Sequence, residues 1–368
     1  MNKKHLVIST IGDPFLASTW SGTPHNIAKA LTEIGIEISG IDASVKSQNV
    51  NRLYRVFNRI WGYGAEDQSI APLNRFHSAR ITQDKIASLG ITKILHIGIR
   101  DLPLFKIDEK VDHYLFIDST WDTWIKDSSI PYRKKLIPVA EGLEKQSFSQ
   151  VKHIFTTAGY VKDNLIDHYK ISPSKISIVG TGRGNIKPYI GIKDYQSGII
   201  LFVAKGRFED KGGFLLIEAF KLAQFVNPNI KLVMVCPEGY IKMIKPVSNL
   251  SLLSSVSWDQ LQQLFNKALL FAMPALNEPW GLVYLEALAC KVPILGLDRN
   301  SIPEITQNGR VGFLAKSPKA EDISEMILKA FSNTEELEKM GLEAQSFCLE
   351  NFSWEKVGEK IIMVIFND

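Results

Sequence analysis

Short apolar runs alternate with longer amphipathic stretches along most of the chain. Runs rich in Ile, Leu, Val and Phe that end at turn residues predict buried strands, because they are too short for helices. In the first half these runs cover residues 5–10, 36–41, 93–97, 114–117, 153–156 and 176–179. In the second half they cover residues 199–204, 231–236, 268–273 and 292–297. Strands that alternate with helices in this way predict an α/β protein built from two series of βαβ units.

The length of the chain favours two domains. It has 368 residues, more than the roughly 250–300 residues that one hydrophobic core usually serves. Between the two strand series, residues 180–198 are rich in Gly, Lys and Tyr and show little periodicity. We therefore predict domains at 1–185 and 190–352 with a hinge between them, and a last helix over residues 353–368.

The most informative segment follows the predicted strand 268–273. It reads PALNEPWGLVYLEALACK, which predicts a loop up to Gly281 and a helix from Leu282. The first amides of this helix lack intrahelical acceptors and favour a diphosphate at the carboxyl edge of a sheet. In this interpretation Glu278 contacts sugar hydroxyls and Glu286, further along the helix, accepts hydrogen bonds from ribose hydroxyls. The alternative is that Glu278 is a first-turn helix charge and Glu286 a solvated surface residue.

A second segment places positive charge after the predicted strand 199–204. The sequence KGRFEDKGG predicts a turn at Gly206, followed by Arg207 and Lys211 in a loop before a helix. Two cations at a strand end can clamp a diphosphate, and they stabilise a leaving phosphate most strongly as its charge grows. The alternatives are that these loop cations are simply solvated, or that Lys205 takes the place of one of them.

Together the two segments resemble the retaining GT-B glycosyltransferases of family four, the group 1 glycosyltransferases. Residues 278–286 match the family's E-x7-E motif, and Pro303-Glu304 and the Asn-Gly-x-x-Gly at 308–312 follow in the family's order. Residues 206–212 resemble its G-R-x(n)-K-G segment. The family usually has Gly-Gly before Pro-Glu, whereas this chain has Asn300-Ser301-Ile302.

The resemblance implies a GT-B fold, with two Rossmann-like, doubly wound domains facing a central cleft and the last helix crossing back onto the first domain. It implies that the domain at 1–185 binds the acceptor and that the domain at 190–352 binds the nucleotide sugar. It implies a hexosyltransferase that moves a sugar from a UDP- or GDP-sugar to an acceptor hydroxyl with retention, in glycan, polysaccharide or glycolipid biosynthesis. The acceptor is an unknown glycan, lipid-linked molecule or protein. The expected catalytic residues are Glu278, Arg207, Lys211 and Asp118, and the expected donor-binding residues are Glu286, Gly22, Gly206, Trp280, Gly281 and Leu282.

The first half offers weaker signals. Gly22 allows close backbone approach to a phosphate, and the amides after it open a predicted helix. The family carries a glycine-rich loop here, although Ser21 replaces one glycine. The alternative is an ordinary strand-to-helix loop with Thr23 as the N-cap.

Two further residues follow strands in the first half. Asp118 begins an Asp-Ser-Thr sequence that resembles the D-x-T found near the reacting sugar in some relatives. There it holds the acceptor hydroxyl or acts as its base, although retaining members of this family are thought to use front-face chemistry aided by the leaving phosphate. We interpret His96 as a packed residue rather than a catalytic one.

Several motifs are missing from the sequence. No Asp-x-Asp motif occurs, which argues against metal-dependent GT-A enzymes, so we expect no metal ion and no cofactor. The glycines at 180, 182 and 184 do not form a dinucleotide fingerprint, because their spacing is wrong and no helical run follows. The remaining alternatives are a noncatalytic sugar-nucleotide-binding protein and a GT-B sugar-nucleotide epimerase.

Composition adds little to these conclusions. The formal net charge of +4 and the seven histidines point to no functional class, and we expect no nucleic-acid partner. Cys236, Cys290 and Cys348 lie in apolar segments and are expected to be packing thiols in a reducing cytoplasm.

One segment raises the question of membrane contact. Arg52, Arg55 and Arg59 recur at helical spacing beside Phe57, Ile60 and Trp61 in residues 52–61. Such a helix can rest on an anionic membrane, which would place the protein at the inner membrane face. We prefer the alternative of a surface helix with its apolar side in the core. No segment reaches the roughly 18 apolar residues of a membrane span, so a soluble or peripheral protein is expected.

Overall fold

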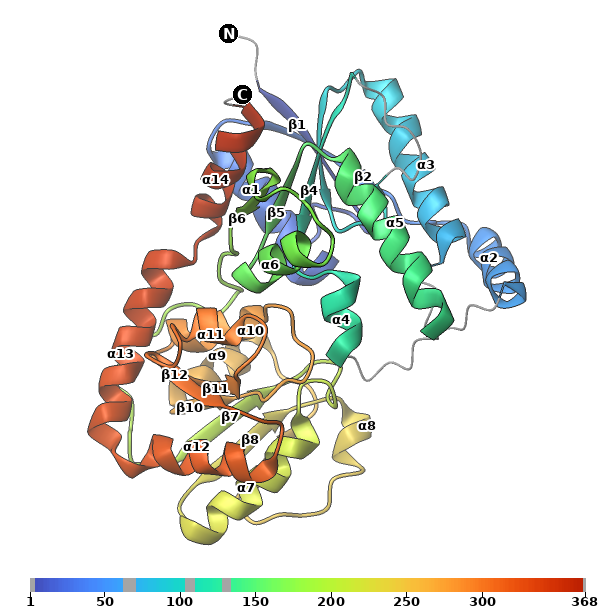
Figure 1. The fold of residues 1–368 in the computed structure, drawn as a ribbon. Coiled ribbons are helices and arrows are strands. Elements are labelled where there is room, and N and C mark those ends of the chain that lie inside the picture. Colours follow the sequence, from blue (N-terminus) through green and yellow to red (C-terminus); the bar gives the residue numbers. More distant parts are fainter. Residues whose placement is uncertain (1–3, 62–70, 103–109, 128–133, 367–368) are drawn as a thin grey trace. The chain divides into compact units, whose positions relative to one another are not determined.

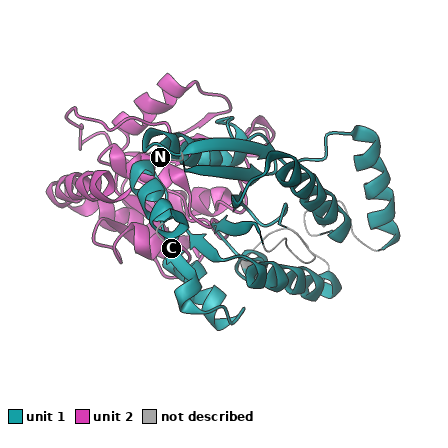
Figure 2. Ribbon diagram, turned by 90° about the horizontal axis from the view of Figure 1, so that it is seen from above, with its two compact units in different colours: residues 1–126, 130–182, 354–368 teal, residues 127–129, 183–353 magenta. Residues whose placement is uncertain are grey.

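The computed structural model describes residues 4–61, 71–102, 110–127 and 134–366. The chain divides into two compact units, unit 1 with residues 1–126, 130–182 and 354–368, and unit 2 with residues 127–129 and 183–353 (Figure 2). Each unit contains a parallel sheet of six strands with helices packed on it (Figure 1). The predicted α/β class with two Rossmann-like sheets is therefore confirmed.

Unit 1 alternates strands and helices in the order expected for βαβ units. Its elements are β1 (His5–Thr10), α1 (Thr23–Glu33), β2 (Glu37–Asp42), α2 (Gln48–Ile60), α3 (Pro72–Leu89), β3 (Lys93–Ile97), β4 (Asp112–Ile117), α4 (Trp121–Asp127), α5 (Ile137–Gln150), β5 (His153–Thr156), α6 (Gly159–Asp167), β6 (Ile176–Ile178) and α14 (Trp354–Phe366). The strand order is β2-β1-β3-β4-β5-β6. The direction in which strands are added reverses between β1 and β3, and such a switch point is where open parallel sheets bind ligands.

The C-terminal helix α14 belongs to unit 1. Its apolar residues Val357, Ile361 and Ile365 are buried in one cluster with Ile27 and Leu31 of α1. The two helices lie side by side in Figure 1. Residues 367 and 368 of the predicted helix lie outside the described residues. Because α14 follows all of unit 2 in the sequence, the chain returns to the unit in which it began.

Unit 2 repeats the architecture with a different strand order. Its elements are β7 (Ile199–Val203), α7 (Gly213–Val226), β8 (Lys231–Val235), α8 (Glu238–Ile241), β9 (Leu250–Leu253), α9 (Trp258–Lys267), β10 (Leu270–Ala272), α10 (Leu282–Ala289), β11 (Ile294–Leu297), α11 (Ile302–Ile305), β12 (Gly312–Ala315), α12 (Ala320–Ser332) and α13 (Thr334–Asn351). The order β12-β11-β10-β7-β8-β9 puts the switch point between β7 and β10.

The sequence pattern missed two strands, β9 and β12. Both lie at the edges of the unit 2 sheet, where a strand pairs with one neighbour only. Their sequences LSLL and GFLA are short and interrupted by Ser or Gly, so they lack the continuous apolar runs that mark strands buried on both faces. All ten predicted strands are present, with ends that shift by up to two residues.

The predicted hinge segment is bound to unit 2 over much of its length. The break between the units falls at Gly182 and Arg183. Beyond it, the ammonium group of Lys193 donates hydrogen bonds to the carbonyls of Phe265, Asn266 and Ala268 at 2.8–2.9 Å. These carbonyls lie at the C-terminal end of α9, so Lys193 caps that helix, and burial lowers its pKa to about 8.

Helix α2 departs from the preferred interpretation of residues 52–61. Its apolar side chains Leu53, Val56, Phe57 and Ile60, and the following Trp61, are 43–71% exposed. The prediction that this helix buries its apolar side in the core is therefore wrong. Only Asn58 is buried among the residues of α2, so the helix contacts the rest of unit 1 through a narrow polar face.

None of the helices within the described residues combines the length and apolar character that crossing a membrane requires.

Candidate functional site

The candidate site of unit 2 lies at the switch point between β7 and β10. These strands are hydrogen-bonded neighbours and run parallel, so both of their carboxyl ends meet at one edge of the sheet. The loop after β7 leads into α7, and the loop after β10 leads into α10. The two motifs that the sequence analysis identified separately occupy these two loops.

Direct hydrogen bonds join the two loops. The backbone amides of Leu276 and Asn277 donate to the carbonyl of Asp210 at 2.7 and 3.3 Å. Arg207 donates from Nε to the buried carboxylate of Asp210 at 3.1 Å, and from Nη2 to the carbonyl of Asn277. Arg207 therefore holds the loops together, and its side chain remains one-third exposed.

An ion pair connects the two motifs. Lys211 Nζ lies 3.1 Å from Glu278 Oε2, and the two side chains are only 19% and 13% exposed. Partial removal from water strengthens the attraction between their charges. A phosphate placed here would compete with Glu278 for Lys211, and a hydroxyl-bearing ligand would compete for Glu278. The alternative that Glu278 is a first-turn helix charge is wrong, because α10 begins at Leu282 after the N-cap Gly281, and the Glu278 carboxylate instead pairs with Lys211.

Glycines keep the starts of α7 and α10 open. Gly212 and Gly281 are the N-caps of these helices and adopt left-handed φ angles of 76° and 80°. A Cβ on Gly281 would lie 2.7 Å from the ring of Tyr284, and one on Gly212 would overlap the carbonyl of Pro274. Larger residues at these positions would therefore disturb the helix starts, whose first amides lack intrahelical acceptors.

Glu286 is buried rather than solvated. It is 7% exposed, and its Oε1 accepts a hydrogen bond of 2.9 Å from the amide of Asn185. Burial raises the pKa of this carboxyl group, against the opposing effects of the Asn185 and Ile186 amides and the charge of Lys205. The alternative of a solvated surface residue is wrong.

The close approach of Glu286 explains Gly184. A Cβ at position 184 would overlap the Glu286 carboxylate. In the sequence this glycine stands out only as part of the series 180, 182 and 184, which does not form a dinucleotide fingerprint. No local pattern connects it with Glu286, because the two residues are about a hundred positions apart.

The structure gives the other residues of this segment different surroundings. Trp280 is 4% exposed, and its ring packs edge-on against Phe352 with centroids 5.9 Å apart. Gly206 is exposed, and a Cβ there would meet nothing within 4 Å. Lys205, the alternative cation, lies 4.0 Å above the ring centre of Trp258. The backbone around Trp280 and Leu282, rather than the indole ring, therefore borders the start of α10.

In unit 1, Gly22 also begins a helix. It is the N-cap of α1 with φ 86°, and no side chain caps that helix start. The alternative in which Thr23 is the N-cap is wrong, because Thr23 is already the first residue of the helix. A Cβ on Gly22 would lie 3.3 Å from both the carbonyl of Ala17 and Asn26 Nδ2.

Asp118 follows β4 at the carboxyl edge of the unit 1 sheet. The hydroxyl of Ser119 donates to its carboxylate at 3.2 Å, and the hydroxyl of Tyr160 donates to its carbonyl at 3.2 Å. The nearby Thr120 is buried and its hydroxyl donates to Asn164 Oδ1 at 2.6 Å. The Asp-Ser-Thr sequence is thus anchored through Thr120, with Asp118 at the strand end.

His96 is a packed residue, as predicted. It is fully buried, with Nδ1 2.8 Å from Asp101 Oδ2 and Nε2 2.9 Å from His113 Nδ1. Burial and the neighbouring His96 lower the pKa of His113 to about 3, so His113 is neutral at physiological pH.

One group of possible metal ligands is present within the described residues, namely Asp122, Glu141 and His168. The Asp122 carboxylate already accepts hydrogen bonds from Lys126 at 2.8 Å and Asn164 at 2.6 Å. Protein donors therefore already satisfy the most buried member of this group.

Comparison with known proteins matches residues 191–347 to the family model "Glycosyl transferases group 1". A similar curated protein is an uncharacterized glycosyltransferase of Methanocaldococcus jannaschii, 31% identical over 173 residues, which are 44% of this chain and 46% of the relative. The chain thus spans about half the length of the relative it matches.

Similar solved structures match nearly the whole chain. The sucrose-phosphate synthase of Thermosynechococcus elongatus has a TM-score of 0.73 at 14% identity, and the alignment covers 99% of this chain and 98% of that one. The structure of Anabaena HepE in complex with UDP has a TM-score of 0.68 at 14% identity, with 99% and 100% covered. At this identity the likeness concerns the fold.

Proposed function

Residues 191–347 belong to the glycosyl transferases group 1 family and the chain has the GT-B fold, and from this premise we propose a function. The protein transfers a sugar from a UDP- or GDP-sugar to an acceptor hydroxyl with retention. The observation that carries this proposal is the Lys211–Glu278 pair, 3.1 Å apart at the switch point of unit 2. It puts a cation for phosphate and a carboxylate for sugar hydroxyls side by side. The UDP in the HepE structure supports a uridine nucleotide as the first candidate.

The diphosphate of the donor binds at the start of α10, beside Lys211 and Arg207. The helix amides and the two cations offer donors and positive charge in one place. When the bond between the anomeric carbon and the phosphate oxygen breaks, that oxygen gains charge. Fixed cations stabilise this charge more in the transition state than in the ground state, which accelerates transfer.

The two glutamates contact the neutral ends of the donor. Glu278, released from Lys211 by the phosphate, accepts hydrogen bonds from sugar hydroxyls. Glu286 binds the ribose, because its carboxylate is held in place by the amide of Asn185. Two carboxylates beside a diphosphate would repel it, so contacts with hydroxyls are the favourable arrangement.

In a retaining reaction the new glycosidic bond forms on the same face of the sugar ring from which the phosphate departs. The acceptor oxygen bonds to the anomeric carbon, and its proton passes to the leaving phosphate oxygen. Asp118 holds the acceptor hydroxyl during this step. No divalent ion is needed in this scheme, since Lys211, Arg207 and the helix start supply the positive charge that an ion would otherwise provide. The product belongs to glycan, polysaccharide or glycolipid synthesis, with a glycan, lipid-linked molecule or protein as acceptor.

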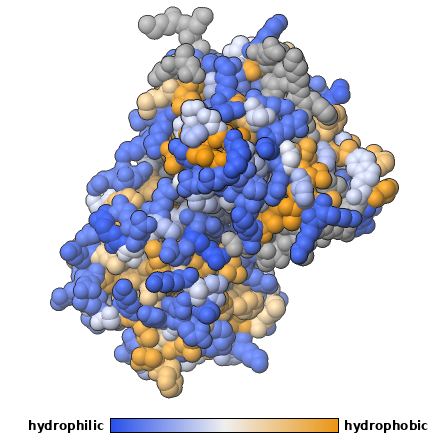
Figure 3. Space-filling view, viewed as in Figure 1, coloured by the Kyte–Doolittle hydropathy of each residue, from blue (hydrophilic) through white to orange (hydrophobic). Residues whose placement is uncertain are grey.

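Helix α2 favours a site of action at an anionic membrane surface in the cytoplasm. Arg52, Arg55 and Arg59 are exposed beside the exposed apolar side chains of the same helix, a combination that binds the interface of charged membranes. The edge of the molecule where α2 lies in Figure 1 mixes apolar and hydrophilic side chains in Figure 3. Sedimentation with phosphatidylglycerol vesicles should capture the protein, and Arg55→Glu should weaken this binding. Equal binding to neutral phosphatidylcholine vesicles would refute this role of α2.

A pair of glutamate variants tests the main proposal. Glu286→Gln should weaken nucleoside diphosphate binding in calorimetry, because the ribose is present in donor and diphosphate alike. Glu278→Gln should spare diphosphate binding and reduce sugar transfer or slow donor hydrolysis. If Glu278→Gln left transfer intact and Glu286→Gln left diphosphate affinity intact, the assignment of both residues would be wrong.

The same assays separate the alternatives. A noncatalytic binding protein would bind donor but produce neither transfer nor hydrolysis with any acceptor. An epimerase would convert the donor into a different sugar nucleotide without an acceptor, which product analysis detects.

A further inference from the structure

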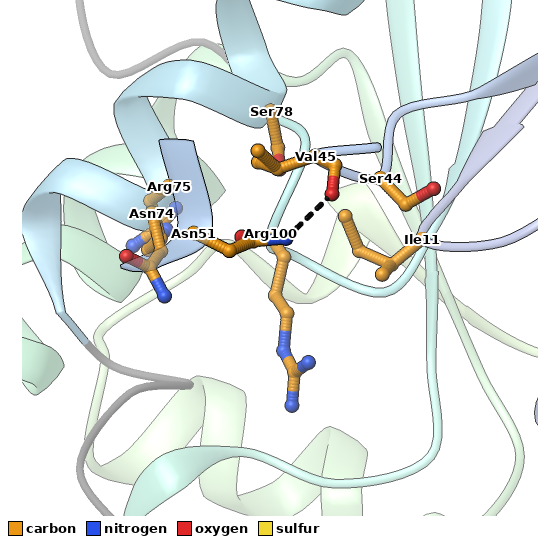
Figure 4. A pocket seen from close by; sticks show the side chains of 8 residues that line it. All are labelled: Ile11, Ser44, Val45, Asn51, Asn74, Arg75, Ser78 and Arg100. Carbon is orange, nitrogen blue, oxygen red and sulfur yellow. Dashed lines mark hydrogen bonds between the residues drawn. The ribbon is translucent and has the colours of Figure 1, made fainter. Parts of the chain in front are cut away.

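Unit 1 has a pocket at its own switch point. The cavity has a volume of about 150 Å³ and lies where the chain leaves β1, β2 and β3 (Figure 4). Its lining comes from five separate stretches of sequence: Ile11, Ser44 and Val45, Asn51, then Asn74, Arg75 and Ser78, and Arg100. In Figure 4, Asn74 and Arg75 lie on one side of the space and Ser44 and Ile11 on the other. A cavity at this position of an open parallel sheet is where a ligand is expected.

The lining is basic and polar. Arg75 is 3% exposed, its Nη2 donates to the carbonyl of Ile99 at 3.2 Å and to Ser147 Oγ at 2.7 Å, and its Nε has no hydrogen-bond partner. Burial, together with the like charge of Arg100, lowers the pKa of Arg75 to about 10. The guanidinium therefore stays charged at neutral pH. A buried charge with an unused donor is costly unless a partner of opposite charge is supplied.

The acids near Arg75 offset its charge only in part. One oxygen of the Asp101 carboxylate lies 2.8 Å from His96 Nδ1, and the other is buried without a hydrogen-bond partner. Burial raises the pKa of Glu144 to about 7, so this group carries only part of a negative charge at neutral pH. The Glu144 carboxylate also accepts hydrogen bonds from the hydroxyl of Tyr169 and the amide of Trp121. An additional anion in the pocket would thus lower the energy of Arg75.

We propose that this pocket binds the anionic group, a phosphate or a carboxylate, of the molecule that accepts the sugar. The inference rests on the proposed glycosyltransferase function and names the class of its acceptor. The volume is below the roughly 300–1,000 Å³ of pockets that hold whole drug-sized ligands, so it suits a small charged group rather than an entire sugar. Serine hydroxyls and asparagine amides in the lining supply further donors.

The pocket lies at a suitable place relative to Asp118. Strand β3 separates β1 from β4, the strand that Asp118 follows. Neighbouring strands are about 4.8 Å apart, so β1 and β4 are separated by about 10 Å, a span that an acceptor of the size of one sugar ring with its charged substituent can cover. The site would therefore select acceptors that carry a charged group about one sugar ring away from the hydroxyl that reacts.

The test is a calorimetric titration of the full chain with inorganic phosphate, with succinate and with neutral glycerol. Phosphate or succinate should bind and glycerol should not. Arg100→Gln, at an exposed position, should weaken anion binding about tenfold or more, the effect of one lost hydrogen bond to a charged group. Arg80→Gln is the matched control, because Arg80 lies on the same helix as Arg75 but faces solvent beside Asp84.

Two further arms make the result decisive. Lys211→Ala should leave the Arg100-dependent binding unchanged, which separates this pocket from the phosphate site of unit 2. UDP is titrated into the same samples, so that a failure of donor binding is recognised as a failure of the proposed function itself. Anion affinity that is equal in wild type and Arg100→Gln, or an anion that does not bind the wild type at all, would overturn the acceptor pocket while leaving donor binding intact.

Discussion

The switch points of the two units differ in how the positive charges of their cations are paired. In unit 2 the cation Lys211 already has a partner of opposite charge, Glu278, at 3.1 Å. In unit 1 the buried Arg75 keeps an unused donor, with Arg100 adding like charge. A ligand at the first site must exchange partners, whereas an anion at the second site adds negative charge beside the two arginines that line the pocket. The comparison suggests that unit 2 is arranged for chemistry and unit 1 for selective binding.

The largest effect should follow loss of a unit 2 cation. Lys211→Ala should reduce turnover by about a hundredfold, similar to the loss of one oxyanion donor, because charge on the leaving phosphate grows in the transition state. Arg207→Ala should act in the same direction and also loosen the loops that Arg207 joins. Turnover and donor affinity are measured separately by steady-state kinetics and calorimetry.

The control for this prediction is Lys221→Ala, on the exposed face of α7 where Lys221 pairs with Glu218. It should change neither quantity. Weaker donor binding with unchanged turnover in Lys211→Ala would show that the cation only docks the donor, and the contrast between the two units would then disappear.

The two sites also differ in how far the sequence could predict them. Arg207, Lys211 and Glu278 lie in two short loops directly after apolar strands, so local patterns located them. The unit 1 pocket draws its residues from five distant stretches, and no local pattern joins Arg75 with Arg100. For the same reason the contact of Gly184 with Glu286 and the burial of Glu286 were not predictable.

The sequence predicts the fold more completely than the site for a related reason. Central strands are buried on both faces and therefore carry continuous apolar runs, whereas the edge strands β9 and β12 need fewer apolar residues and were missed. The exposed face of α2 was misjudged because helical periodicity reveals an apolar stripe but not what covers it.

A smaller effect should follow from filling the space beside Glu286. Gly184→Ala places a methyl group against the Glu286 carboxylate, so it should weaken nucleoside diphosphate binding by up to about tenfold, the value of one displaced hydrogen bond. Overpacking should also lower stability by roughly 1–3 kcal/mol. Gly239→Ala in helix α8 of unit 2 is the control, since nothing lies within 4 Å of its added carbon. Equal nucleoside diphosphate affinities in the two variants would mean that Glu286 does not bind the nucleotide.

A further effect, on stability rather than on activity, concerns the buried histidines of unit 1. The pKa of His113 is lowered to about 3 in the fold, against roughly 6.5 when unfolded. Between these values the unfolded chain binds more protons, so this contribution to stability is present above pH 6.5 and is lost as the pH falls. His113→Asn should remove this dependence, which amounts to at most about 1.4 kcal/mol per pH unit.

Urea unfolding at several pH values measures this contribution. The difference in stability between wild type and His113→Asn should grow from pH 4 to pH 6.5 and then level off, within the window that the two pKa values define. A difference that stays constant with pH would mean that folding leaves the pKa of His113 unchanged.

The most direct test of the central claim is the thermal stability of the wild-type protein with UDP and GDP in the presence of a chelator. If unit 2 is a nucleotide-sugar site that uses its own cations, one of these diphosphates should stabilise the fold by about 2.7 kcal/mol at a hundredfold excess over its dissociation constant. The Lys211→Ala variant should require more ligand for the same effect. Stabilisation that vanishes in chelator, or that is identical in wild type and Lys211→Ala, would contradict the account.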